Sequence, residues 1–590
     1  MKSEHPPYKP EPRRRDGARR QFTRGKRAPR GIAWFGVSAF SGHLRHFAAS
    51  AIATEDVDSR DWMQGDEPRA LMQRVLRRLG ASGSGTGGGE SITQSLGRDL
   101  WIDYVADTGD DVSVSEAVAR LIFAPYTLPE PRAADATVAA PRGDILIFGG
   151  DTAYPVATAQ EIESRVVEPF NRVLEERRDD RPRVLMGIPG NHDWYDGLDG
   201  FGRLFRRRRS DDAPRAGTRP GTRGAKRWRT MTHYAEWAVE FVRGGSVHKQ
   251  GALVLEGYQP VQNASYFCLP LAPGVAMLAV DRQLTHLDFR QVEHFRSWLN
   301  RHLSLAPWVL LPDPVYHFGE ASPSGTKMIE SLGLHLGARP HLVLAGDIHH
   351  YRREQSGKSL LVTAGGGGAF LHPAPLRSQQ TVPARVAWPD AAQSKRLLWG
   401  VPFRIAFGGA GILPHLALMA MFSPYLVVDP LHSGEIGRAG LAPLGIWIVT
   451  TLVYSLLGGL QQGRLVSVIP AAIAGALTAS LPLLASILLH GAFGALGAQL
   501  PSWSLVILAL LAAALVGAFV FGAYLALMTR LGWESTQAFT ALGHPGFKHF
   551  VRFRVRADGS AVDAWVLGLE DPLAPGEKPV LVDHFSWPTR

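Results

Sequence analysis

Between residues 100 and 370 the chain repeats one pattern, a short apolar run that ends in small and polar residues. Buried strands whose carboxyl ends deliver polar side chains are how open α/β sheets build a site. The pattern therefore predicts an α/β fold with a functional site along one edge of a largely parallel sheet. The clearest runs are residues 144–148, 183–188, 275–280, 341–345 and 359–364.

Helical spacing occurs between these runs. Residues 159–178 place apolar side chains three and four apart, on one face of a helix. Asp288 and Gln291 are spaced as in a capping box, which predicts a helix from there to about Leu303. Nearer the C-terminus, the alternating residues 550–555 and 562–567 predict strands. We expect these strands to form a small sheet against the α/β part.

Four long apolar runs follow the α/β part, and none of them contains Asp, Glu, Lys or Arg. Each has 20 or more residues, the length and polarity of a helix that crosses a bilayer. The alternative is four buried helices of a large soluble core. The four predicted transmembrane helices are Ile405–Val428, Leu441–Leu460, Leu465–Leu489 and Trp503–Met528.

Charges beside these runs predict their orientation. Four crossings would return the chain to its starting side, so the C-terminal residues would share a side with the α/β part. Lys395, Arg396 and Arg404 precede the first run and Arg530 follows the last. By the positive-inside rule, the α/β part faces the cytoplasm. We therefore expect a multi-pass protein of the inner (cytoplasmic) membrane, with the lipid bilayer as a partner.

Five segments follow from these patterns. Residues 1–30 form a basic tail that we expect to be disordered, and residues 31–99 form an N-terminal extension with a Gly/Ser-rich linker. The α/β part covers residues 100–375, the transmembrane helices cover residues 398–529, and residues 530–590 form a C-terminal cytoplasmic segment.

The basic charge of the chain is concentrated. Of 590 residues, 63 are Lys or Arg and 53 are Asp or Glu. Residues 1–30 hold 11 basic and 3 acidic residues, and the insertion at residues 203–229 holds 11 and 2. The insertion could bind a polyanion, but its only aromatic residues are Phe205 and Trp228, so nucleic acid is not the favoured partner. The single cysteine, Cys268, excludes a disulfide scaffold and a cysteine zinc cluster.

Four short motifs near the ends of the predicted strands contain side chains that commonly bind metal ions. Each motif supplies Asp, Asn, His or Tyr, whose oxygen and imidazole ligands suit Fe, Mn or Zn rather than a thiolate site. Two metal ions about 3.5–4 Å apart need a bridging carboxylate and can hold a hydroxide for in-line attack on phosphorus. The motifs are residues 107–109, 150–154, 190–193 and 346–350.

With these D-x-G, G-D-x-x-Y and G-N-H-D motifs, residues 101–370 resemble the calcineurin-like metallophosphoesterase superfamily, most nearly its purple acid phosphatase branch. The resemblance implies a four-layer α/β/β/α sandwich, to which this chain would add a four-helix transmembrane bundle. It also implies two metal ions, drawn from Mn, Fe, Zn and Mg, and hydrolysis of phosphoric esters. By the same resemblance, the metal ligands are Asp107, Asp151, Tyr154 and His349 for the first ion, with Asp151 bridging to a second ion that Asn191 also binds. His192 would act at the leaving group, and Asp193 would orient it.

Two positions depart from the family pattern, both at the second metal. Asp347 stands where the G-H-x-H motif has its first histidine, and Pro312 stands where a ligand histidine is expected. Asp313 and His317 are both near enough to replace that histidine, and the sequence leaves open which of them does, if either. With Asp347 as a ligand, the second site is oxygen-rich and favours Mn²⁺ or Mg²⁺ over Zn²⁺.

Residues beside the motifs are expected to bind substrate, namely Trp194, Tyr195 and His350. Tyr154 has an alternative to metal binding, which is to pack beneath the next helix. The glycines at residues 365–368 could bring backbone amides to a phosphate or make a tight turn.

The favoured function is a membrane-anchored metallophosphoesterase that hydrolyses a phosphomonoester or phosphodiester with a metal-activated hydroxide. Its substrate would be a phosphorylated small molecule or a lipid-linked phosphate. There are two alternatives. One is a sensor that binds a phosphorylated ligand without turnover because its second metal site is weakened. The other is a membrane-tethered nuclease that uses the basic insertion.

Overall fold

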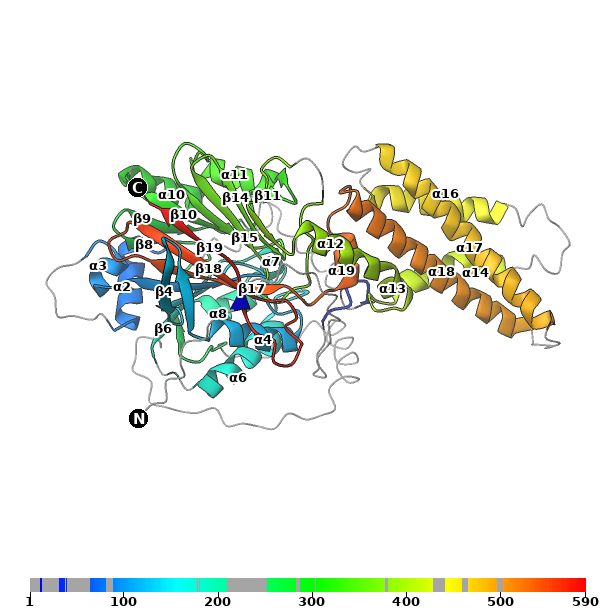
Figure 1. Cartoon of the computed structure of the whole chain (residues 1–590), viewed down its shortest axis with the longest axis horizontal. Helices are drawn as coiled ribbons and strands as arrows, with labels where there is room; N and C mark the ends of the chain where they lie inside the picture. The colour runs from blue at the N-terminus through cyan, green and yellow to red at the C-terminus, as the bar shows by residue number, and fades with distance from the viewer. Residues whose placement is uncertain are drawn as a thin grey trace.

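The computed structural model joins a part rich in strands to a part made of helices (Figure 1). It describes residues 11–12, 31–37, 39, 64–80, 89–177, 179, 181–208, 252–282, 287–302, 304–376, 380–427, 441–458, 465–495 and 502–589. Most of the basic tail and residues 209–229 of the basic insertion lie outside the described residues. The predictions made for them therefore stay predictions.

The first sheet has eight described strands. Their order is β1 (Glu11–Pro12), β19 (Val580–Pro588), β18 (Ala561–Leu569), β17 (Lys548–Val555), β2 (Leu100–Val105), β5 (Ile145–Phe148), β6 (Arg183–Gly187) and β7 (Tyr258–Pro260). β2, β5, β6 and β7 pair in parallel, as the sequence predicts for this region, whereas β17 pairs antiparallel with β2.

The second sheet has seven described strands. Their order is β16 (Val386–Trp388), β14 (Tyr351–Ser356), β15 (Ser359–Ala364), β13 (Leu342–Ala345), β10 (Ala306–Leu311), β9 (Val275–Ala279) and β8 (Phe267–Ala272). β9, β10, β13 and β15 are parallel neighbours. Two hairpins complete the strands, β3 (Tyr126–Glu130) with β4 (Ala133–Ala140), and β11 (Tyr316–His317) with β12 (Glu320–Ala321).

Helices fill the connections between these strands. They are α2 (Pro68–Arg78), α3 (Ile92–Leu96), α4 (Val112–Ile122), α5 (Ala159–Ile162), α6 (Glu168–Arg177), α7 (Asn191–Trp194), α8 (Asp199–Phe205), α10 (Phe289–Arg301) and α11 (Pro323–Ser331). A π-helical turn, Glu163–Val167, joins α5 to α6, so the helix predicted at residues 159–178 is confirmed.

Neighbouring side chains on the central strands enter different cores. Ile147 of β5 belongs to a core that also holds Trp308 of the second sheet. The next residue, Phe148, packs on the other side against Phe170 of α6, with ring centroids 6.0 Å apart. Both faces of these strands are therefore buried, which explains why the runs are continuously apolar.

The helix predicted after Asp288 is confirmed, but its predicted capping box is wrong. The Asp288 side chain makes no cap hydrogen bond. The amide of Gln291 instead accepts from the Asp281 N–H at 2.8 Å and donates to the Asp281 carbonyl at 2.6 Å. The buried backbone of Asp281, ten positions earlier, has taken the Gln291 amide in place of the local cap, because unmet backbone groups inside the protein are costly.

The C-terminal strands continue the first sheet, so the prediction of a small separate sheet is wrong. Residues 551–555 of β17 pair with β2, which buries Arg552 against Asp103. Arg552 Nε and Nη2 donate to the two Asp103 carboxylate oxygens at 2.6 and 3.0 Å. The same guanidinium donates to the carbonyl oxygens of Ile122 and Ala124 at 2.7 and 2.8 Å. This network fastens the C-terminal segment to the core.

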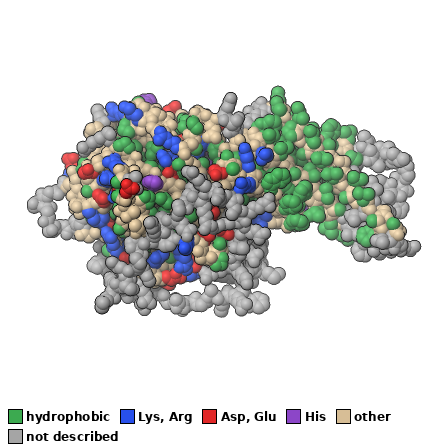
Figure 2. Space-filling model, viewed as in Figure 1, with side chains coloured by type: hydrophobic (Ala, Val, Ile, Leu, Met, Phe, Trp, Pro, Cys, Tyr) green, Lys and Arg blue, Asp and Glu red, His purple; other side chains and the backbone are tan. Residues whose placement is uncertain are grey.

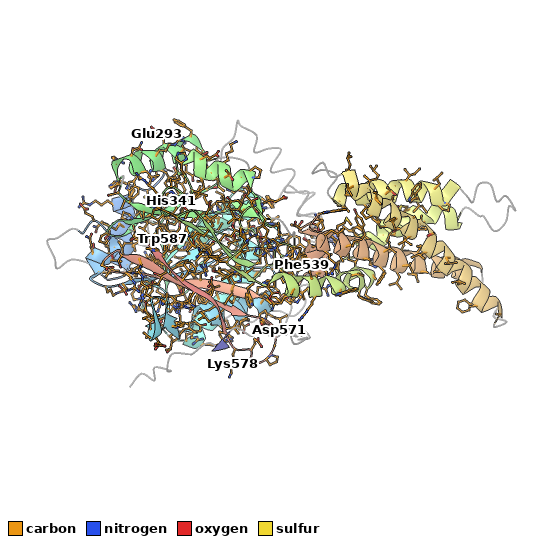
Figure 3. All side chains as sticks on the ribbon, turned by 45° about the horizontal axis from the view of Figure 1, so that its top comes forward. Glu293, His341, Phe539, Asp571, Lys578 and Trp587 are labelled. Atoms are coloured by element: carbon orange, nitrogen blue, oxygen red, sulfur yellow. The ribbon has the colours of Figure 1, made fainter. Side chains whose placement is uncertain are left out.

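The remaining helices form the second part of the chain. They are α12 (Ala391–Leu397), α13 (Val401–Ala406), α14 (Leu413–Val427), α16 (Leu441–Leu457), α17 (Val468–Ala495), α18 (Ser502–Arg530) and α19 (Gln537–Leu542). Phe539 of α19 is buried where the two parts meet (Figure 3).

Two of these helices, not four, are long and apolar enough to cross a membrane. The qualifying segments are Leu465–Pro482 and Leu510–Arg530. The described helices α14 and α16 have only 15 and 17 residues. At about 1.5 Å per residue they reach roughly 22–26 Å, less than the ~30 Å hydrocarbon core of a bilayer. The prediction of four spans is therefore corrected to two candidates among the described residues.

Exposed apolar side chains gather on this helical part (Figure 2). Ile469 and Leu488 of α17 and Leu511 of α18 are 64%, 63% and 53% exposed. Contiguous apolar surfaces are rare on soluble monomers and mark protein or membrane contacts. The surface is of the kind that a helix presents to lipid.

The sheet pairing limits how the helices can cross a membrane. β2 precedes these helices in the chain and β17 follows them, yet the two strands are hydrogen-bonded neighbours. Both must lie on the same side of any membrane. The intervening helices can therefore cross it only an even number of times.

Candidate metal centre

Four strand ends deliver the predicted ligands to one end of the two sheets. Asp107 follows β2, Asp151 follows β5, Asn191 begins α7 after β6, and Asp347 follows β13. The Asp107 N–H donates to the Gly150 carbonyl at 3.0 Å, which ties the first two ends together. The Asp347 N–H donates to Asp107 Oδ2 at 3.0 Å and so joins the second sheet to the first.

All three aspartates at these strand ends adopt a backbone conformation that costs free energy. Asp107, Asp151 and Asp347 have φ values of +59°, +47° and +67°. Left-handed conformations are uncommon in residues other than glycine and often occur at functional sites. Here the strained positions coincide with three of the predicted metal ligands.

Glycines let the surrounding loops approach these carboxylates. A Cβ on Gly190 would lie 2.2 Å from Asp151 Oδ1, and one on Gly365 would lie 2.5 Å from Asp107 Oδ2. Gly367 donates its N–H to the Ala106 carbonyl at 2.9 Å. These contacts favour close packing as the purpose of residues 365–368, because the Gly367 amide is used within the protein.

The Tyr154 hydroxyl is the point at which the first set of ligands converges. It lies 3.0 Å from Asp107 Oδ1, 3.3 Å from Asp151 Oδ2 and 3.0 Å from His349 Nε2. His349 Nε2 is also 3.5 Å from Asp107 Oδ1. Tyr154 therefore turns its hydroxyl into the cluster, and the structure brings together the four residues predicted for the first metal.

The hydrogen bond made by His349 Nδ1 determines the protonation state of His349 Nε2. His349 Nδ1 lies 2.7 Å from the Phe370 carbonyl oxygen, a partner that only an N–H can satisfy. The proton therefore sits on Nδ1, and Nε2 keeps a lone pair directed at Asp107 and Tyr154. A histidine held in this way is ready to bind a metal through Nε2.

Burial sets the charge state of the cluster. Burial raises the pKa of Asp107 to about 8. Burial and the charges of neighbouring aspartates raise the pKa values of Asp151 and Asp347 well above the usual range. Burial also lowers the pKa of His349 to about 3, so the imidazole is neutral. Carboxylates crowded in this way ionise together only when a cation compensates them.

The donors fit a metal ion in chemistry, although their arrangement is not that of a formed site. Within the described ranges, no three His, Cys, Asp or Glu side chains are arranged as a ready-made metal site. Two carboxylates, one neutral imidazole and one phenol oxygen nevertheless converge through Tyr154. This donor set suits Mn, Fe or Zn.

The structure distinguishes the two candidates for the missing second-metal histidine. His317, on β11, places Nε2 3.8 Å from Asp347 Oδ2, and this nitrogen is buried without a hydrogen-bond partner among the described residues. Asp313 instead forms an ion pair with Arg282, whose Nη1 lies 2.6 Å from its carboxylate, and accepts from the Ser324 hydroxyl at 2.7 Å. His317 therefore faces Asp347, whereas Asp313, whose nearby charge adds to burial in raising the pKa of Asp347, is already paired with Arg282.

His192 and Asp193 have different surroundings. The His192 ring is held by the Pro155 carbonyl, 2.6 Å from Nδ1, and its backbone N–H donates to Asp151 Oδ1 at 2.8 Å. Asp193 accepts from the Gly190 and Thr152 N–H groups at 2.9 and 3.3 Å. Asp193 therefore holds the backbone of the loops, the Pro155 carbonyl contacts the His192 ring directly, and the orienting role of Asp193 stays a prediction.

The three residues predicted to bind substrate have different surroundings. Tyr195 packs on His192, with ring centroids 4.9 Å apart, and its hydroxyl accepts from Asn191 Nδ2 at 2.5 Å. Trp194 points into the core and donates to Asp281 Oδ1 at 2.9 Å. His350 is buried, with Nδ1 2.8 Å from the Pro373 carbonyl. Trp194 and His350 thus have partners within the protein, and their binding of substrate stays a prediction.

Several residues at the site were missed by the sequence analysis. Trp34 packs against Tyr154 and His192, and His372 stacks on His349 with ring centroids 4.1 Å apart. Lys548, on β17, is buried beneath the site, and burial lowers its pKa to about 7 against the opposing charges of Asp110 and Asp107. The apolar run at residues 32–35 was the one local signal; the other two depend on pairing between distant segments.

Comparisons with known proteins do not assign a family. No family model matches the chain, and no curated protein matches it. Among solved structures, it is similar to GAP50, the anchor in the inner membrane complex of Plasmodium. The identity is 8%, the TM-score is 0.29, and the match covers 49% of this chain and 78% of that chain. A similarity of this size supports no argument about function.

Proposed function

We propose that this protein is a membrane-associated, metal-dependent phosphoesterase. The observation that carries the proposal is the convergence of Asp107, Asp151 and His349 on the Tyr154 hydroxyl. Strained aspartates and obligatory glycines hold this cluster at the strand ends. Backbone strain of this kind is often found at functional sites.

The proposed fold is a four-layer α/β/β/α sandwich. Its support is the core shared by the two sheets, which contains Ile147 and Trp308. Phe170 of α6 and Phe295 of α10 lie in the second core, with side chains from both sheets. The helices would then form the two outer layers.

The ligands divide into two sets. Asp107, Tyr154 and His349 would hold one metal ion, and Asp151 would bridge to a second that Asn191, Asp347 and His317 complete. When bound, two such ions (Mn, Fe, Zn or Mg) supply a hydroxide nucleophile and polarise a phosphoryl oxygen. The second set, with two carboxylates and an amide oxygen, is oxygen-rich, which suits Mn²⁺ or Mg²⁺.

His192 is the residue proposed to act at the leaving group. The Pro155 carbonyl holds Nδ1 and leaves Nε2 as the working nitrogen. In its protonated form, Nε2 can donate to the oxygen that departs from phosphorus. The His192 N–H donates to Asp151 Oδ1, and this hydrogen bond fixes the position of His192 relative to the proposed bridging carboxylate.

The position of the site relative to the helical part suggests where the substrate lies. α7 lies at the end of the sheets nearer the helical part (Figure 1). The Leu371 N–H, beside the site, donates at 3.0 Å to the carbonyl of His544, which follows α19. We propose that α17 and α18 cross the inner membrane, that the site faces the cytoplasm, and that the substrate is a phosphorylated small molecule or a lipid-linked phosphate.

A phosphate-binding sensor is the second candidate. The pairing of Asp313 with Arg282 removes one carboxylate that could have repaired the second metal site. A protein with one weakened metal would bind inorganic phosphate without turnover. The nuclease alternative depends on residues 203–229, most of which lie outside the described residues, and it stays a prediction.

Hydrolysis by the full chain in detergent tests the proposal. The probes are p-nitrophenyl phosphate and bis-p-nitrophenyl phosphate, each with Mn²⁺, Fe²⁺, Zn²⁺ or Mg²⁺. Asp107→Asn should lower metal-dependent turnover by about a hundredfold or more. Asp199→Asn, whose side chain is 59% exposed on α8, is the matched control and should keep wild-type turnover. No turnover by folded wild type with any metal, together with phosphate binding, would favour the sensor.

A further inference from the structure

An N-terminal strap, residues 31–37, covers one side of the candidate site. Its Trp34 is 6% exposed and packs edge-on against Tyr154 and His192, with ring centroids 5.8 and 6.2 Å apart. Phe370 lies on the same indole at 5.0 Å. Trp34 therefore touches both a proposed metal ligand and the residue proposed to act at the leaving group.

The strap is fastened to the loop that carries Asp107. The Gly31 N–H donates to Asp111 Oδ2 at 2.7 Å, and the Ile32 N–H donates to Asp110 Oδ1 at 2.8 Å. Both acceptors are ionisable carboxylates, and hydrogen bonds of this kind are among the stronger ones in proteins. The first end of the strap is thus held three to four positions beyond Asp107 in the sequence.

The other end of the strap is paired with the helical part. The Phe35 N–H donates to the Ala410 carbonyl at 2.8 Å, and the Leu413 N–H donates to the Phe35 carbonyl at 3.1 Å. Ala410 lies in the turn between α13 and α14, and the Phe35 ring is 6.4 Å from that of Phe521 on α18. The strap thus connects the site to a candidate membrane helix.

Gly411 makes this docking possible. It has a φ of +131°, and a Cβ at this position would lie 2.2 Å from the Phe35 carbonyl carbon. Both the conformation and the contact exclude a side chain. Gly408, in the same turn, has a φ of +72°, but the nearest atom to its Cβ would be 4.0 Å away.

We propose that Trp34 is a positioning residue for His192 and Tyr154, and that the turn between α13 and α14 controls its position through the strap. The inference rests on the proposed function, because it assigns a regulator to the same site. The His192 ring is bounded by Trp34, Tyr154 and Tyr195, with the polar anchor at Pro155. Withdrawal of Trp34 frees one edge of the imidazole, so His192 loses its orientation, while Asp107, Asp151 and His349 keep their places.

Gly411→Ala tests this coupling without altering any residue of the site. In the full chain, Gly411→Ala and Trp34→Ala should each lower kcat for p-nitrophenyl phosphate by about tenfold, with KM nearly unchanged. Trp34→Phe, which keeps an aromatic edge, should restore most of kcat. Gly408→Ala is the matched control and should leave kcat at the wild-type value, because its Cβ meets no part of the strap.

Hydrogen–deuterium exchange gives a readout that does not need turnover. Gly411→Ala should speed exchange in residues 31–37 and in residues 190–195 together, and Gly408→Ala should change neither. Faster exchange in the strap alone, or equal effects of the two glycine variants, would overturn the coupling. Wild-type kcat in Trp34→Ala would overturn the positioning role. An inactive wild type would instead overturn the proposed function, while the exchange result still decides whether the strap is coupled to the site.

Discussion

Replacing Arg552 by methionine should detach the C-terminal strands from the first sheet. Arg552 and Asp103 are both 0% exposed, and β17 meets β2 at this pair. The guanidinium donates two hydrogen bonds to Asp103 and three to the carbonyl oxygens of Ile122, Ala124 and Ala140. Methionine fills much of the volume but leaves a carboxylate buried without its cation.

The size of the effect follows from that unpaired charge. Breaking a buried ion pair by removing one partner costs about 3–5 kcal/mol. At roughly 2–4 °C per kcal/mol for a large domain, the midpoint of thermal unfolding should fall by about 6–20 °C. Removing both charges in Arg552→Met with Asp103→Leu should recover much of this loss. A residual cost of about 1–3 kcal/mol is expected, because the Gly143 N–H, 2.8 Å from Asp103 Oδ2, then loses its acceptor.

Thermal unfolding of the full chain in detergent, followed by intrinsic fluorescence, provides the assay. Arg296→Met, on the exposed face of α10, is the control and should shift the midpoint by less than about 2 °C. Limited proteolysis should also cut the single variant faster within residues 543–590. If Arg552→Met unfolds within about 3 °C of wild type, or if the double variant is no more stable than the single one, the reasoning about this ion pair is refuted.

Three further predictions concern the site and the membrane. His317→Ala should reduce the number of Mn²⁺ ions bound per chain by one. Asp313→Asn should leave that number unchanged, because Asp313 is paired with Arg282. Equal stoichiometry in both variants would contradict the assignment. Burial raises the pKa of Asp107 to about 8, above the roughly 3.9 of an unfolded carboxyl. The native state therefore holds a proton that the unfolded chain has released, and the stability of metal-free wild type relative to Asp107→Asn should fall as pH rises from about 4 to 8. Added Mn²⁺ should remove this dependence, and a difference that does not vary with pH would refute it. Finally, Arg396→Cys and Lys578→Cys should react with an impermeant maleimide from the same side of sealed vesicles, because β2 pairs with β17. The native Cys268 is buried and should stay silent; labelling from opposite sides would exclude an even number of crossings.

The convergence of the four residues proposed to bind the first metal could be anticipated, because each follows its own strand end. Asp107 and Asp151 each follow a buried run directly, and parallel strands bring such ends to one edge. The same local logic does not place the Trp194 side chain, because a tryptophan beside a polar motif can equally face the core. Only the three-dimensional structure showed that its indole donates to Asp281.

Other features depend on partners that the local spacing does not indicate. Gln291 fitted a capping box by spacing, but its amide is used by Asp281. The sequence pattern of β17 predicts a strand, but it does not indicate that β2 is the neighbouring strand. The preference for His317 over Asp313 rests on the ion pair between Asp313 and Arg282. Arg282 lies shortly after the end of β9. In each case a tertiary partner, rather than the spacing, determined the result.

The most direct test of the metal centre is calorimetric titration of Mn²⁺ into the metal-free full chain, with Asp151→Asn alongside. Asp151 is the proposed bridge between both ions, and a Cβ on Gly190 would lie 2.2 Å from its carboxylate, which shows how tightly its place is fixed. The account predicts two Mn²⁺ per wild-type chain and loss of both in Asp151→Asn. Absence of binding by wild type, or identical binding by wild type and Asp151→Asn, would contradict it.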